Sequence, residues 1–467
     1  MKKIILLTLV ILSAAIIRLT AQDVRPFQKG DRIVFEGNSI THGGHYHSYV
    51  WLYYMTHFPD RRIEIFNCGI GGDVAGGMYK RLDSDVFSKH PTVIVLTFGM
   101  NDAGYYEYLQ PDAKAQADKK VQQSYDDYQK IEKRLLAYTP AQKIMLTSPP
   151  FDETAKVKSP VFPGKNAAML RIADFQEASA KKHGWGFIDL SRPMTAINER
   201  EQQRDSTFTL QGQGRIHPDN DGHLVMAYLI LKKQGLAGKD VANVHIDAGN
   251  GKISRSDNCR ISNLSATPAG IRFDYLANSL PFPIDTLVRG WGEIKAQSDA
   301  LPYIPFMKEF DNERLAVAGL KSGSYVLKMD GEKIGTWSAE ELAGGINLAE
   351  QRNTPEYRQA LAIMTLNETR WEIEKKFRDY YWMEYSFLQD KGLLFHDDVA
   401  ALDTIREAAR ENIFVRGNMQ AYIEGHFKSV REAWKGEMKL LTDKIYAINK
   451  PVSHRVEITP ARRPPFP

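Results

Sequence analysis

Short apolar runs alternate with amphipathic segments over the first half of the chain. The apolar runs predict strands at residues 32–36, 62–67, 92–98, 143–148 and 185–189. The third run is apolar throughout, which is typical of a parallel strand buried on both faces. The intervening spacing predicts helices at residues 48–57, 76–89, 121–138, 165–183 and 222–234. Alternating strands and helices predict an α/β domain built on a doubly wound parallel sheet.

The pattern changes after about residue 240. Apolar and polar residues alternate from Ile271 to Tyr275, as in a strand with one buried face. Farther on, Asp330-Gly331 separates two short apolar runs, and this favoured two-residue turn predicts a β-hairpin. Residues 241–350 are therefore expected to form a small β-rich domain.

From Thr354 the spacing of apolar residues becomes helical, first over residues 357–388 and then over residues 399–448. We expect a helical region at residues 351–455 and a disordered tail at residues 456–467. Glycines at 417, 425 and 436 are expected to break the second stretch. The first stretch is rich in aromatic residues, which could line a sugar-binding surface but are more often core: Trp371, Phe377, Tyr380, Tyr381, Trp382 and Tyr385.

The N-terminus has the pattern of a secretory signal peptide. Two lysines precede an apolar run from Ile4 to Ile17, and Ala21 precedes the expected cleavage site. The run is short for a membrane span. We therefore expect a secreted or periplasmic protein without a membrane span after cleavage, whose first domain covers residues 22–240.

Charge and cysteine content narrow the possible partners. The full chain has a net charge of +4, and residues 1–21 carry three basic residues and no acid, so the mature chain has a charge of +1. A nearly neutral chain argues against a nucleic-acid partner. Cys68 and Cys259 could pair, but two cysteines are no disulfide framework. The sequence leaves the oligomeric state open.

Four polar blocks follow predicted strands or precede a predicted helix. The first is Gly37-Asn38-Ser39, the second runs from Asn67 to Asp73, and the third is Gly99-Met100-Asn101-Asp102. The fourth, Arg215-Ile216-His217-Pro218, lies just before the last predicted helix of the domain. Open α/β sheets bind ligands at the carboxyl edge of their strands, so we expect these blocks to meet there.

Ser, Gly, Asn and His in this order and in these contexts resemble the SGNH hydrolases, also called the GDSL family of esterases and lipases. The resemblance covers roughly residues 30–235 and implies a flavodoxin-like sheet. It implies that Ser39 is the nucleophile and His217 the general base, and that no cofactor or metal takes part. It also implies an oxyanion hole formed by the backbone N–H groups of Ser39 and Gly72 with the side-chain amide of Asn101. Ester hydrolysis needs such a nucleophile, base and set of donors.

Two positions depart from the family pattern. Asn38 stands where the family usually has Asp before the serine, and asparagine keeps much of that hydrogen-bonding capacity. Gly214 stands where the family has the third triad member, an Asp three residues before the histidine. A backbone carbonyl could orient His217 instead, or one of three nearby acids: Asp205, Asp219 or Asp221.

A histidine cluster, His42, His45 and His47, directly follows the serine. Imidazoles bind zinc, so a metal site is conceivable, but no carboxylate or cysteine with ligand spacing accompanies the cluster. We expect these histidines to shape the substrate pocket together with Tyr46 and Tyr49.

The sequence therefore predicts a secreted serine esterase that hydrolyses carboxylic esters, with acetyl esters on carbohydrate as the expected substrates. The signal peptide, the additional aromatic region and the lack of a recognisable lipid-binding lid favour glycan substrates. A lipolytic esterase or lysophospholipase is one alternative. Because of Gly214, a catalytically impaired glycan-binding protein on an esterase scaffold is another.

Overall fold

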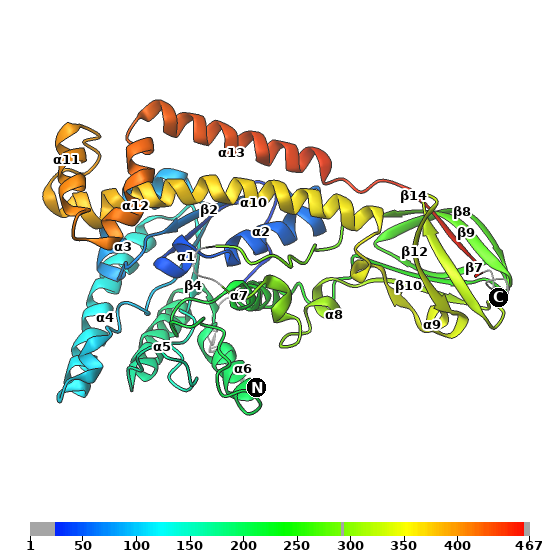
Figure 1. Cartoon of the computed structure of the whole chain (residues 1–467), viewed down its shortest axis with the longest axis horizontal. Helices are drawn as coiled ribbons and strands as arrows, with labels where there is room; N and C mark the ends of the chain where they lie inside the picture. The colour runs from blue at the N-terminus through cyan, green and yellow to red at the C-terminus, as the bar shows by residue number, and fades with distance from the viewer. Residues whose placement is uncertain (1–23, 291–293, 462–467) are drawn as a thin grey trace, which may run out of the picture.

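The computed structural model describes residues 24–290 and 294–461. The expected signal peptide at residues 1–21 lies outside these ranges. Figure 1 shows an elongated molecule, with an α/β domain and a layer of long helices on one side and a domain of strands on the other.

The α/β domain is built on a five-stranded parallel sheet with the order β2-β1-β3-β4-β5. This is the strand order of a flavodoxin-like doubly wound sheet, so the predicted fold class is confirmed. Each strand overlaps a predicted apolar run: β1 (Arg32–Gly37), β2 (Glu64–Gly69), β3 (Val93–Leu96), β4 (Gln142–Leu146) and β5 (Gly186–Ile188).

Helices cover both faces of this sheet. On one face α2 packs against α7, and on the other α4 packs against both α3 and α5. The helices of the domain are α1 (Ser39–His42), α2 (Tyr46–His57), α3 (Ala75–Arg81), α4 (Ala113–Ala137), α5 (Lys165–His183), α6 (Ser191–Gln202) and α7 (Asn220–Lys233). Short π and 3-10 turns occupy Leu82–Val86, Phe87–Lys89 and Tyr106–Leu109.

Helix α2 is buried along its whole length, because α7 contacts one side of it and α10 of the helical layer contacts another. Its sequence, from Tyr46 to His57, has no charged acid or amine and no clear polar face. A helix without a separate polar face is typical of the interior of a large protein. The helical layer therefore shares a core with the α/β domain.

The second domain is a sandwich of two sheets whose inner faces share one apolar core. The first sheet has the order β13-β10-β6-β7, with β6 (Ala242–Asp247), β7 (Lys252–Asp257), β10 (Glu313–Ala318) and β13 (Ile346–Asn347). The second has the order β12-β11-β14-β9-β8, with β8 (Cys259–Thr267), β9 (Gly270–Ala277), β11 (Ser324–Met329), β12 (Glu332–Ser338) and β14 (His454–Pro460). The predicted strand near Ile271 and the hairpin at Asp330-Gly331 are both present.

The boundaries of this domain differ from the predicted ones in two ways. Residues 278–290 and 294–312, which contain α8 (Phe306–Phe310), return to the α/β domain, where Leu280, Phe282 and Phe306 join its core. Residues 456–460, predicted to begin a disordered tail, instead belong to β14, which pairs with β9 and β11. The alternation of Val456 and Ile458 buries both side chains in the sandwich.

A layer of helices covers the α/β domain. Helix α10 (Pro355–Trp382) crosses the top of the domain in Figure 1, and α13 (Lys428–Ile448) packs along it. In sequence, α11 (Val399–Ala408) and α12 (Ile413–Gly425) connect α10 to α13, and they lie at one end of the layer in Figure 1. The chain breaks at Gly425 as predicted, but Gly417 and Gly436 lie inside helices.

Most of the aromatic residues of this layer are core, as the sequence favoured. Trp371, Phe377, Tyr380 and Tyr385 are buried, whereas Tyr381 and Trp382 are half-buried. Buried aromatic residues at helical spacing seal α10 against its neighbours. They do not form an exposed sugar-binding strip.

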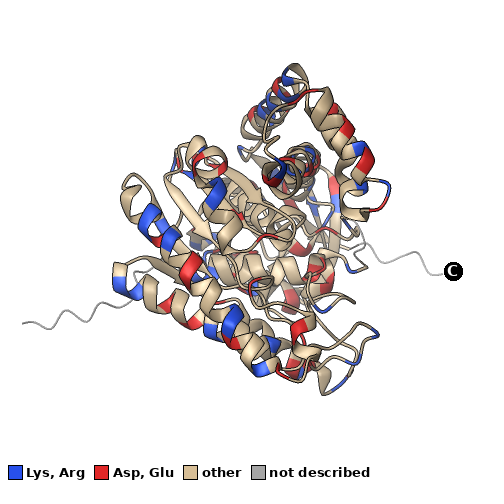
Figure 2. Ribbon diagram, turned by 90° about the vertical axis from the view of Figure 1, so that its left-hand side faces the viewer, with Lys and Arg blue, Asp and Glu red and all other residues tan. Residues whose placement is uncertain are grey.

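The surface carries charges of both signs. Figure 2 shows Lys and Arg interspersed with Asp and Glu along the helices. Among the described residues, none of the helices combines the length and the apolar character that crossing a membrane requires. Cys68 and Cys259 are both free thiols.

Candidate active site

Ser39 stands at the carboxyl edge of the sheet, where β1 ends and α1 begins. The side chain of Asn38 caps α1 by accepting a hydrogen bond from the backbone N–H of Ile40 at 3.0 Å. Asn38 thus supplies the cap that the family's usual aspartate could also supply. A Cβ at Gly37 would lie 2.2 Å from Thr41 Oγ1, so only glycine fits this tight turn. The half-buried Ser39 side chain is left facing the edge.

The fold brings Ser39 and His217 into contact. His217 Nε2 lies 2.8 Å from Ser39 Oγ, which is hydrogen-bond distance. The His217 side chain is exposed on one side, yet desolvation by the surrounding protein lowers the pKa of its imidazole below the ordinary value. A neutral imidazole in contact with a hydroxyl can act as a general base.

The loop that carries His217 is anchored by Arg215. The guanidinium of Arg215 is buried and donates to the backbone carbonyls of Asp152, Ala155, Val157 and Ser159. Its backbone has a φ of 63°, a left-handed conformation that is uncommon outside glycine. The many hydrogen bonds of the side chain therefore fix a backbone conformation that would be strained alone.

In the part of the chain that the structure describes, no carboxylate forms a hydrogen bond or ion pair with His217. Asp205 is exposed and accepts hydrogen bonds from Thr207. Asp219 is the N-cap residue of α7, and burial raises its pKa. Asp221 is buried and forms an ion pair with Lys295 at 3.1 Å. The three acids considered from the sequence therefore have other environments.

Gly214 leaves space where the family has its acid. A Cβ at this position would have no heavy atom within 4 Å, and its φ lies outside the left-handed region. The structure thus contains room for a side chain three residues before His217.

The loop from Gly69 to Asp73 runs beside the nucleophile. Ile70 N donates to Gly37 O at 3.0 Å, so this loop and the Ser39 turn leave the sheet together. Gly72 is exposed, has a φ of 81°, and a Cβ there would meet no atom within 4 Å. Its N–H donates to no acceptor in the described residues. A free N–H at this edge is available to a ligand.

Asn101 is oriented by two hydrogen bonds. Its Nδ2 donates to Asp73 O at 2.8 Å, and its Oδ1 accepts from the Tyr105 hydroxyl at 2.7 Å. A hydroxyl donor at Oδ1 fixes which end of the amide is the NH2 group. One of the two Nδ2 hydrogens is used by Asp73, and the second remains for a ligand.

Two buried arginines that the sequence analysis did not identify stabilise the Ser39 turn and the Gly69–Asp73 loop by donating to their backbone carbonyls. Arg81 is buried and donates to Gly37 O at 3.1 Å, Cys68 O at 2.7 Å and Asp73 Oδ2 at 2.8 Å. Arg378, from α10, donates to Gly69 O at 3.0 Å. No motif marks these arginines in the sequence, because arginines on helices usually face solvent.

Both arginines bind the same buried carboxylate, Asp85, with N–O distances of 2.7–2.9 Å. Burial alone would raise the pKa of Asp85, but the two guanidinium groups outweigh it and hold the pKa below its usual range. Nearby, burial raises the pKa of Glu36 to about 8, so this carboxyl is protonated at neutral pH. The two guanidinium groups thus share the ionised Asp85, and Arg81 also binds Asp73.

The loop of Asn101 is held in a similar way by Lys165. Its ammonium donates to the backbone carbonyls of Met100 and Gly104 and lies 3.7 Å from the centroid of the Tyr105 ring. Burial lowers the pKa of Lys165 to about 7. Lysine at the first position of a helix gave no signal of this role in the sequence.

The histidine cluster does not have the predicted role in shaping the pocket. His45 and His47 are fully buried, and Tyr46 and Tyr49 are buried with them. His45 stacks on Trp371 with a ring separation of 3.9 Å, and burial lowers the pKa of His47 to about 4. Only His42 reaches the Gly69–Asp73 loop. In the described ranges, no group of histidine, cysteine or acidic side chains is arranged to hold a metal ion.

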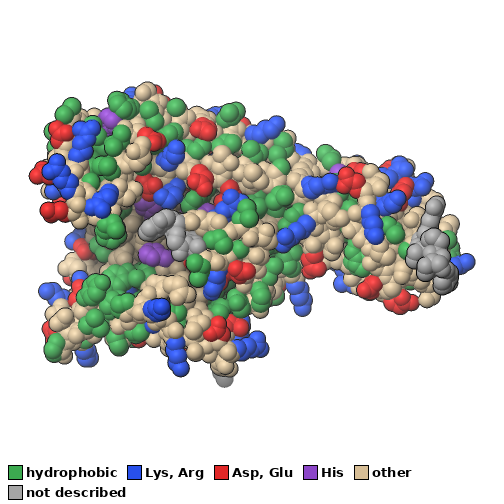
Figure 3. Space-filling model, in the orientation of Figure 1, with side chains coloured by type: hydrophobic (Ala, Val, Ile, Leu, Met, Phe, Trp, Pro, Cys, Tyr) green, Lys and Arg blue, Asp and Glu red, His purple; other side chains and the backbone are tan. Residues whose placement is uncertain are grey.

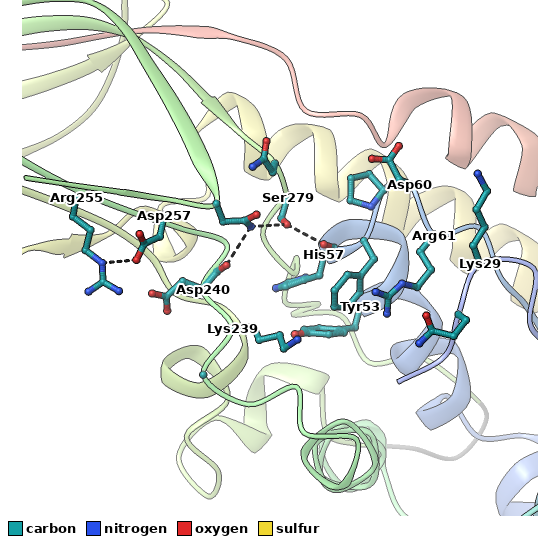
Figure 4. Close-up of a pocket in the computed structure, with 16 residues that line it drawn as sticks. Lys29, Tyr53, His57, Asp60, Arg61, Lys239, Asp240, Arg255, Asp257 and Ser279 are labelled. Carbon is teal, nitrogen blue, oxygen red and sulfur yellow. Dashed lines mark hydrogen bonds and ion pairs between the residues drawn. The ribbon is translucent and has the colours of Figure 1, made fainter. Parts of the chain in front are cut away.

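Figure 3 shows the face of the molecule hollowed between the helical layer and the α/β domain, with histidine side chains in the hollow. A separate cavity of about 690 Å³ lies between the α/β domain and the β-sandwich. Figure 4 shows it lined by residues such as Tyr53 and His57 on one side and Arg255 and Asp257 on the other. Neither Ser39 nor His217 lines this second cavity.

Two family profiles match the chain. The GDSL-like lipase/acylhydrolase family matches residues 35–225, and the diltiazem deacetylase C-terminal helical domain matches residues 361–450. The family resemblance found in the sequence is thereby confirmed. The second profile lies on the helical layer, whose family the sequence did not suggest.

Solved structures give a match over almost the whole chain. A protein described as BT4096, a gut microbial diltiazem-metabolizing enzyme, is 50% identical, with a TM-score of 0.92 over 94% of this chain and 100% of that one. An acetylxylan esterase, Axe2 from Geobacillus stearothermophilus, is 19% identical and matches 45% of this chain and 96% of its own, with a TM-score of 0.35. LAE5, a hydrolase from the metagenome of Lake Arreo, is 22% identical and matches 45% and 97%, with a TM-score of 0.34. A search of curated proteins found no match.

Proposed function

The chain belongs to the GDSL-like lipase/acylhydrolase family and is an ester hydrolase, and from this premise we propose that it removes acetyl groups with Ser39 as nucleophile and His217 as base. The observation that carries the proposal is the 2.8 Å contact between Ser39 Oγ and His217 Nε2. In an ester hydrolase, a serine in contact with a neutral imidazole at a sheet edge is the expected nucleophile and base.

The reaction begins when Ser39 Oγ attacks the ester carbonyl carbon and its proton moves to His217 Nε2. The carbonyl oxygen becomes an oxyanion, which accepts hydrogen bonds from the N–H groups of Ser39 and Gly72 and from Asn101 Nδ2. The intermediate collapses, the C–O bond to the alcohol breaks, and His217 returns the proton to that oxygen. Water then attacks the acetyl-serine with the same base, which releases acetate and restores Ser39.

The proposed site works without a carboxylate on His217. In serine proteases the triad aspartate holds the histidine in one tautomer, and disabling it costs roughly 10⁴-fold in kcat. Here the Arg215 anchor fixes the backbone of the His217 loop, and the lowered pKa of His217 keeps its imidazole neutral. Partial compensation of this kind is compatible with a working but slower esterase.

Acetyl esters of small molecules are the proposed substrate class. The support is a relative of 50% identity whose description is diltiazem-metabolizing, together with the deacetylase helical domain at residues 361–450. Acetylated glycan fragments are the second candidate, because the N-terminus has the pattern of an export signal and extracellular glycans carry acetyl esters.

We further propose that the protein is exported and that cleavage follows Ala21. Export would place the enzyme outside the cytoplasm with glycan or small-molecule esters. Expression of the full chain in a Gram-negative bacterium, followed by N-terminal sequencing of the periplasmic protein, should give Gln22 as the first residue. A chain that retains Met1 in the cytoplasm would contradict the proposal.

The activity test compares the purified mature chain with its Ser39→Ala variant on an aryl acetate, diltiazem, acetylated xylo-oligosaccharides and a long-chain ester. We expect hydrolysis of the acetates only, and loss of it in Ser39→Ala. Ser88→Ala, which changes an exposed serine of the same domain, is the control and should keep full activity. A preference for the long-chain ester would indicate a lipase. Glycan binding without turnover would indicate a non-catalytic protein.

A further inference from the structure

The end of helix α10 contacts the loop that carries Gly72. Trp382 Nε1 donates a hydrogen bond to Gly71 O at 2.9 Å. The indole ring also packs against this loop, since a Cβ at Gly71 would lie 3.3 Å from Trp382 Cδ1 and Nε1. Trp382 belongs to the helical layer, more than 300 residues away in sequence. The contact therefore links the C-terminal helices to the proposed oxyanion hole.

The accepting carbonyl belongs to the same peptide group as the Gly72 N–H. A peptide group is planar, and every described peptide bond is trans, so its C=O and N–H point in opposite directions. Holding Gly71 O towards α10 directs the Gly72 N–H away from α10. Gly72 itself is exposed, and a Cβ there would meet no heavy atom within 4 Å, so the surroundings of this residue are open. Trp382 thus fixes the direction of a donor that it does not touch.

The preceding peptide group is fixed by His42. Gly71 N donates to His42 Nδ1 at 3.1 Å, and His42 Nε2 lies 2.8 Å from Asp379 Oδ1. An Nδ1 that accepts leaves Nε2 as the protonated nitrogen, which donates to the carboxylate. Burial lowers the pKa of His42, so its imidazole stays neutral. The neutral ring keeps Nδ1 as the acceptor from Gly71 N and Nε2 as the donor to Asp379.

Asp379 is suited to this role because it stays ionised. Burial alone would raise its pKa, but the hydrogen bond from His42 and the charge of Lys375 outweigh burial and lower it. Lys375 Nζ lies 2.7 Å from Asp379 Oδ2. Lys375, Asp379 and Trp382 follow one another at helical spacing and share one face of α10. Trp382 on this face contacts the loop directly, and Asp379 acts on it through His42.

We propose that Trp382 is a positioning residue for the oxyanion hole: through Gly71 O it aims the Gly72 N–H at the carbonyl oxygen of the substrate. The helical layer is then a working part of the esterase and not an appended domain. Because hydrogen bonds in one peptide group reinforce each other, the bond at Gly71 O also strengthens the Gly72 N–H as a donor. This inference rests on the proposed function of Ser39 and Gly72.

The test is Trp382→Phe, which keeps a ring against Gly71 and removes the indole N–H. Loss of one oxyanion donor lowers kcat by about 10²–10³-fold. A donor that is displaced but still present should cause only part of this decrease. We therefore expect kcat on an aryl acetate to fall about 10- to 100-fold. KM should stay within about twofold, because ground-state binding is not affected. The rate of phosphonylation of Ser39 should fall with kcat, since the phosphonyl oxygen occupies the same hole.

Trp434→Phe is the matched control. Trp434 lies in α13 of the same layer and packs on Phe377, away from the Gly69–Asp73 loop. It should keep both kcat and the phosphonylation rate. If Trp382→Phe does not fold, Gly71→Ala provides a second test, because its methyl group displaces the indole. It should lower kcat with little change in KM.

The outcomes separate this inference from the proposed function. Hydrolysis that depends on Ser39 in the unmodified protein, with kcat unchanged in folded Trp382→Phe, would overturn the inference alone. A rise in KM at constant kcat would also overturn it, because Trp382 would then contact the substrate. If Ser39→Ala retains full hydrolysis, the proposed function itself fails.

Discussion

The loop that carries Gly72 is fixed by side chains from two distant parts of the chain. The His217 ring, by contrast, forms a single hydrogen bond within the described residues, with Ser39. Arg81 and Arg378 hold the carbonyls of the first loop, and Trp382 and His42 hold the peptide groups on either side of Gly71. In the second loop Arg215 anchors the backbone, but in the described residues no carboxylate reaches the imidazole. The oxyanion side is therefore the more rigidly prepared half of the site.

The difference teaches where this protein departs from a minimal α/β esterase. Preorganised donors are often the largest contribution to catalysis in such enzymes, because they need no rearrangement as charge develops. A site that lacks the acid on its base can rely more heavily on its donors. Substitutions that alter one half of the site at a time can separate the two contributions.

Removing the base should have the largest effect. His217→Ala should lower kcat by roughly 10⁶-fold, as loss of the serine or histidine does in comparable serine hydrolases. Steady-state hydrolysis of an aryl acetate measures the change. His90→Ala, at an exposed histidine of the same domain, is the control. Comparable rates for His217→Ala and the unmodified protein would mean that another group takes the proton.

Breaking the buried ion network should mainly affect stability. Arg378→Met leaves Asp85 buried with one cation instead of two, and disrupting a buried pair costs about 3–5 kcal/mol in the free energy of unfolding. Chemical denaturation provides the measurement. Lys376→Met, at an exposed neighbour on α10, should change it by less than about 1 kcal/mol. Equal effects of the two substitutions would show that the network does not brace the loops.

Removing one donor should weaken the oxyanion half without breaking it. Asn101→Ala should lower kcat by about 10²–10³, with a smaller change in KM. Tyr105→Phe removes the hydroxyl that orients the amide and should lower kcat less than Asn101→Ala does. An unchanged kcat in Asn101→Ala would leave Asn101 as a loop residue bonded to Asp73.

Adding the missing acid should strengthen the weaker half. Gly214→Asp should raise kcat/KM on an aryl acetate by about tenfold, because a carboxylate can orient His217 and stabilise its imidazolium. The open space at Gly214 and its φ allow the new side chain without strain. Gly214→Asn is the neutral control. A folded Gly214→Asp without a gain would mean that His217 is already oriented, and Asp219→Asn would then be the next substitution.

The smallest effect is a shift in pH dependence. Because burial lowers the pKa of His217 below 6.5, kcat/KM should hold constant down to a pH below that value and then fall as the imidazole gains a proton. In Gly214→Asp the new charge favours the imidazolium, so the fall should begin about one unit higher. A profile that falls above pH 6.5 in the unmodified protein would contradict the lowered pKa.

The sequence predicted the five strands and the polar blocks at their ends, because apolar runs and short polar blocks are local signals. The flavodoxin-like sheet followed from the family resemblance, and the structure brings two of the blocks into contact through Ser39 and His217. Arg81, Arg378 and Trp382 could not be identified in this way. The role of Arg81 depends on its burial beneath the Gly69–Asp73 loop. The roles of Arg378 and Trp382 depend on contacts of α10 with Gly69 and Gly71, more than 300 residues away in sequence. From local patterns alone, an arginine on a helix is predicted to lie at the surface and a tryptophan to lie in the core.

Two predictions from the sequence are wrong because each depends on packing between segments that lie far apart in the chain. His45 and His47 follow the nucleophile in sequence and were expected in the pocket, but α10 covers α2 and buries both. The tail after residue 455 looked disordered because its basic and proline-rich end is polar. Its first residues nevertheless complete a sheet, since β9 and β11 leave a gap between them that β14 fills.

The most direct test of the central claim is to map the adduct formed by a serine-reactive aryl phosphonate on the mature protein by peptide mass spectrometry. The account predicts one adduct, on Ser39, formed at a rate that falls in Trp382→Phe and is lost in Ser39→Ala. An adduct on a different serine, or continued ester hydrolysis after Ser39 is fully modified, would contradict it.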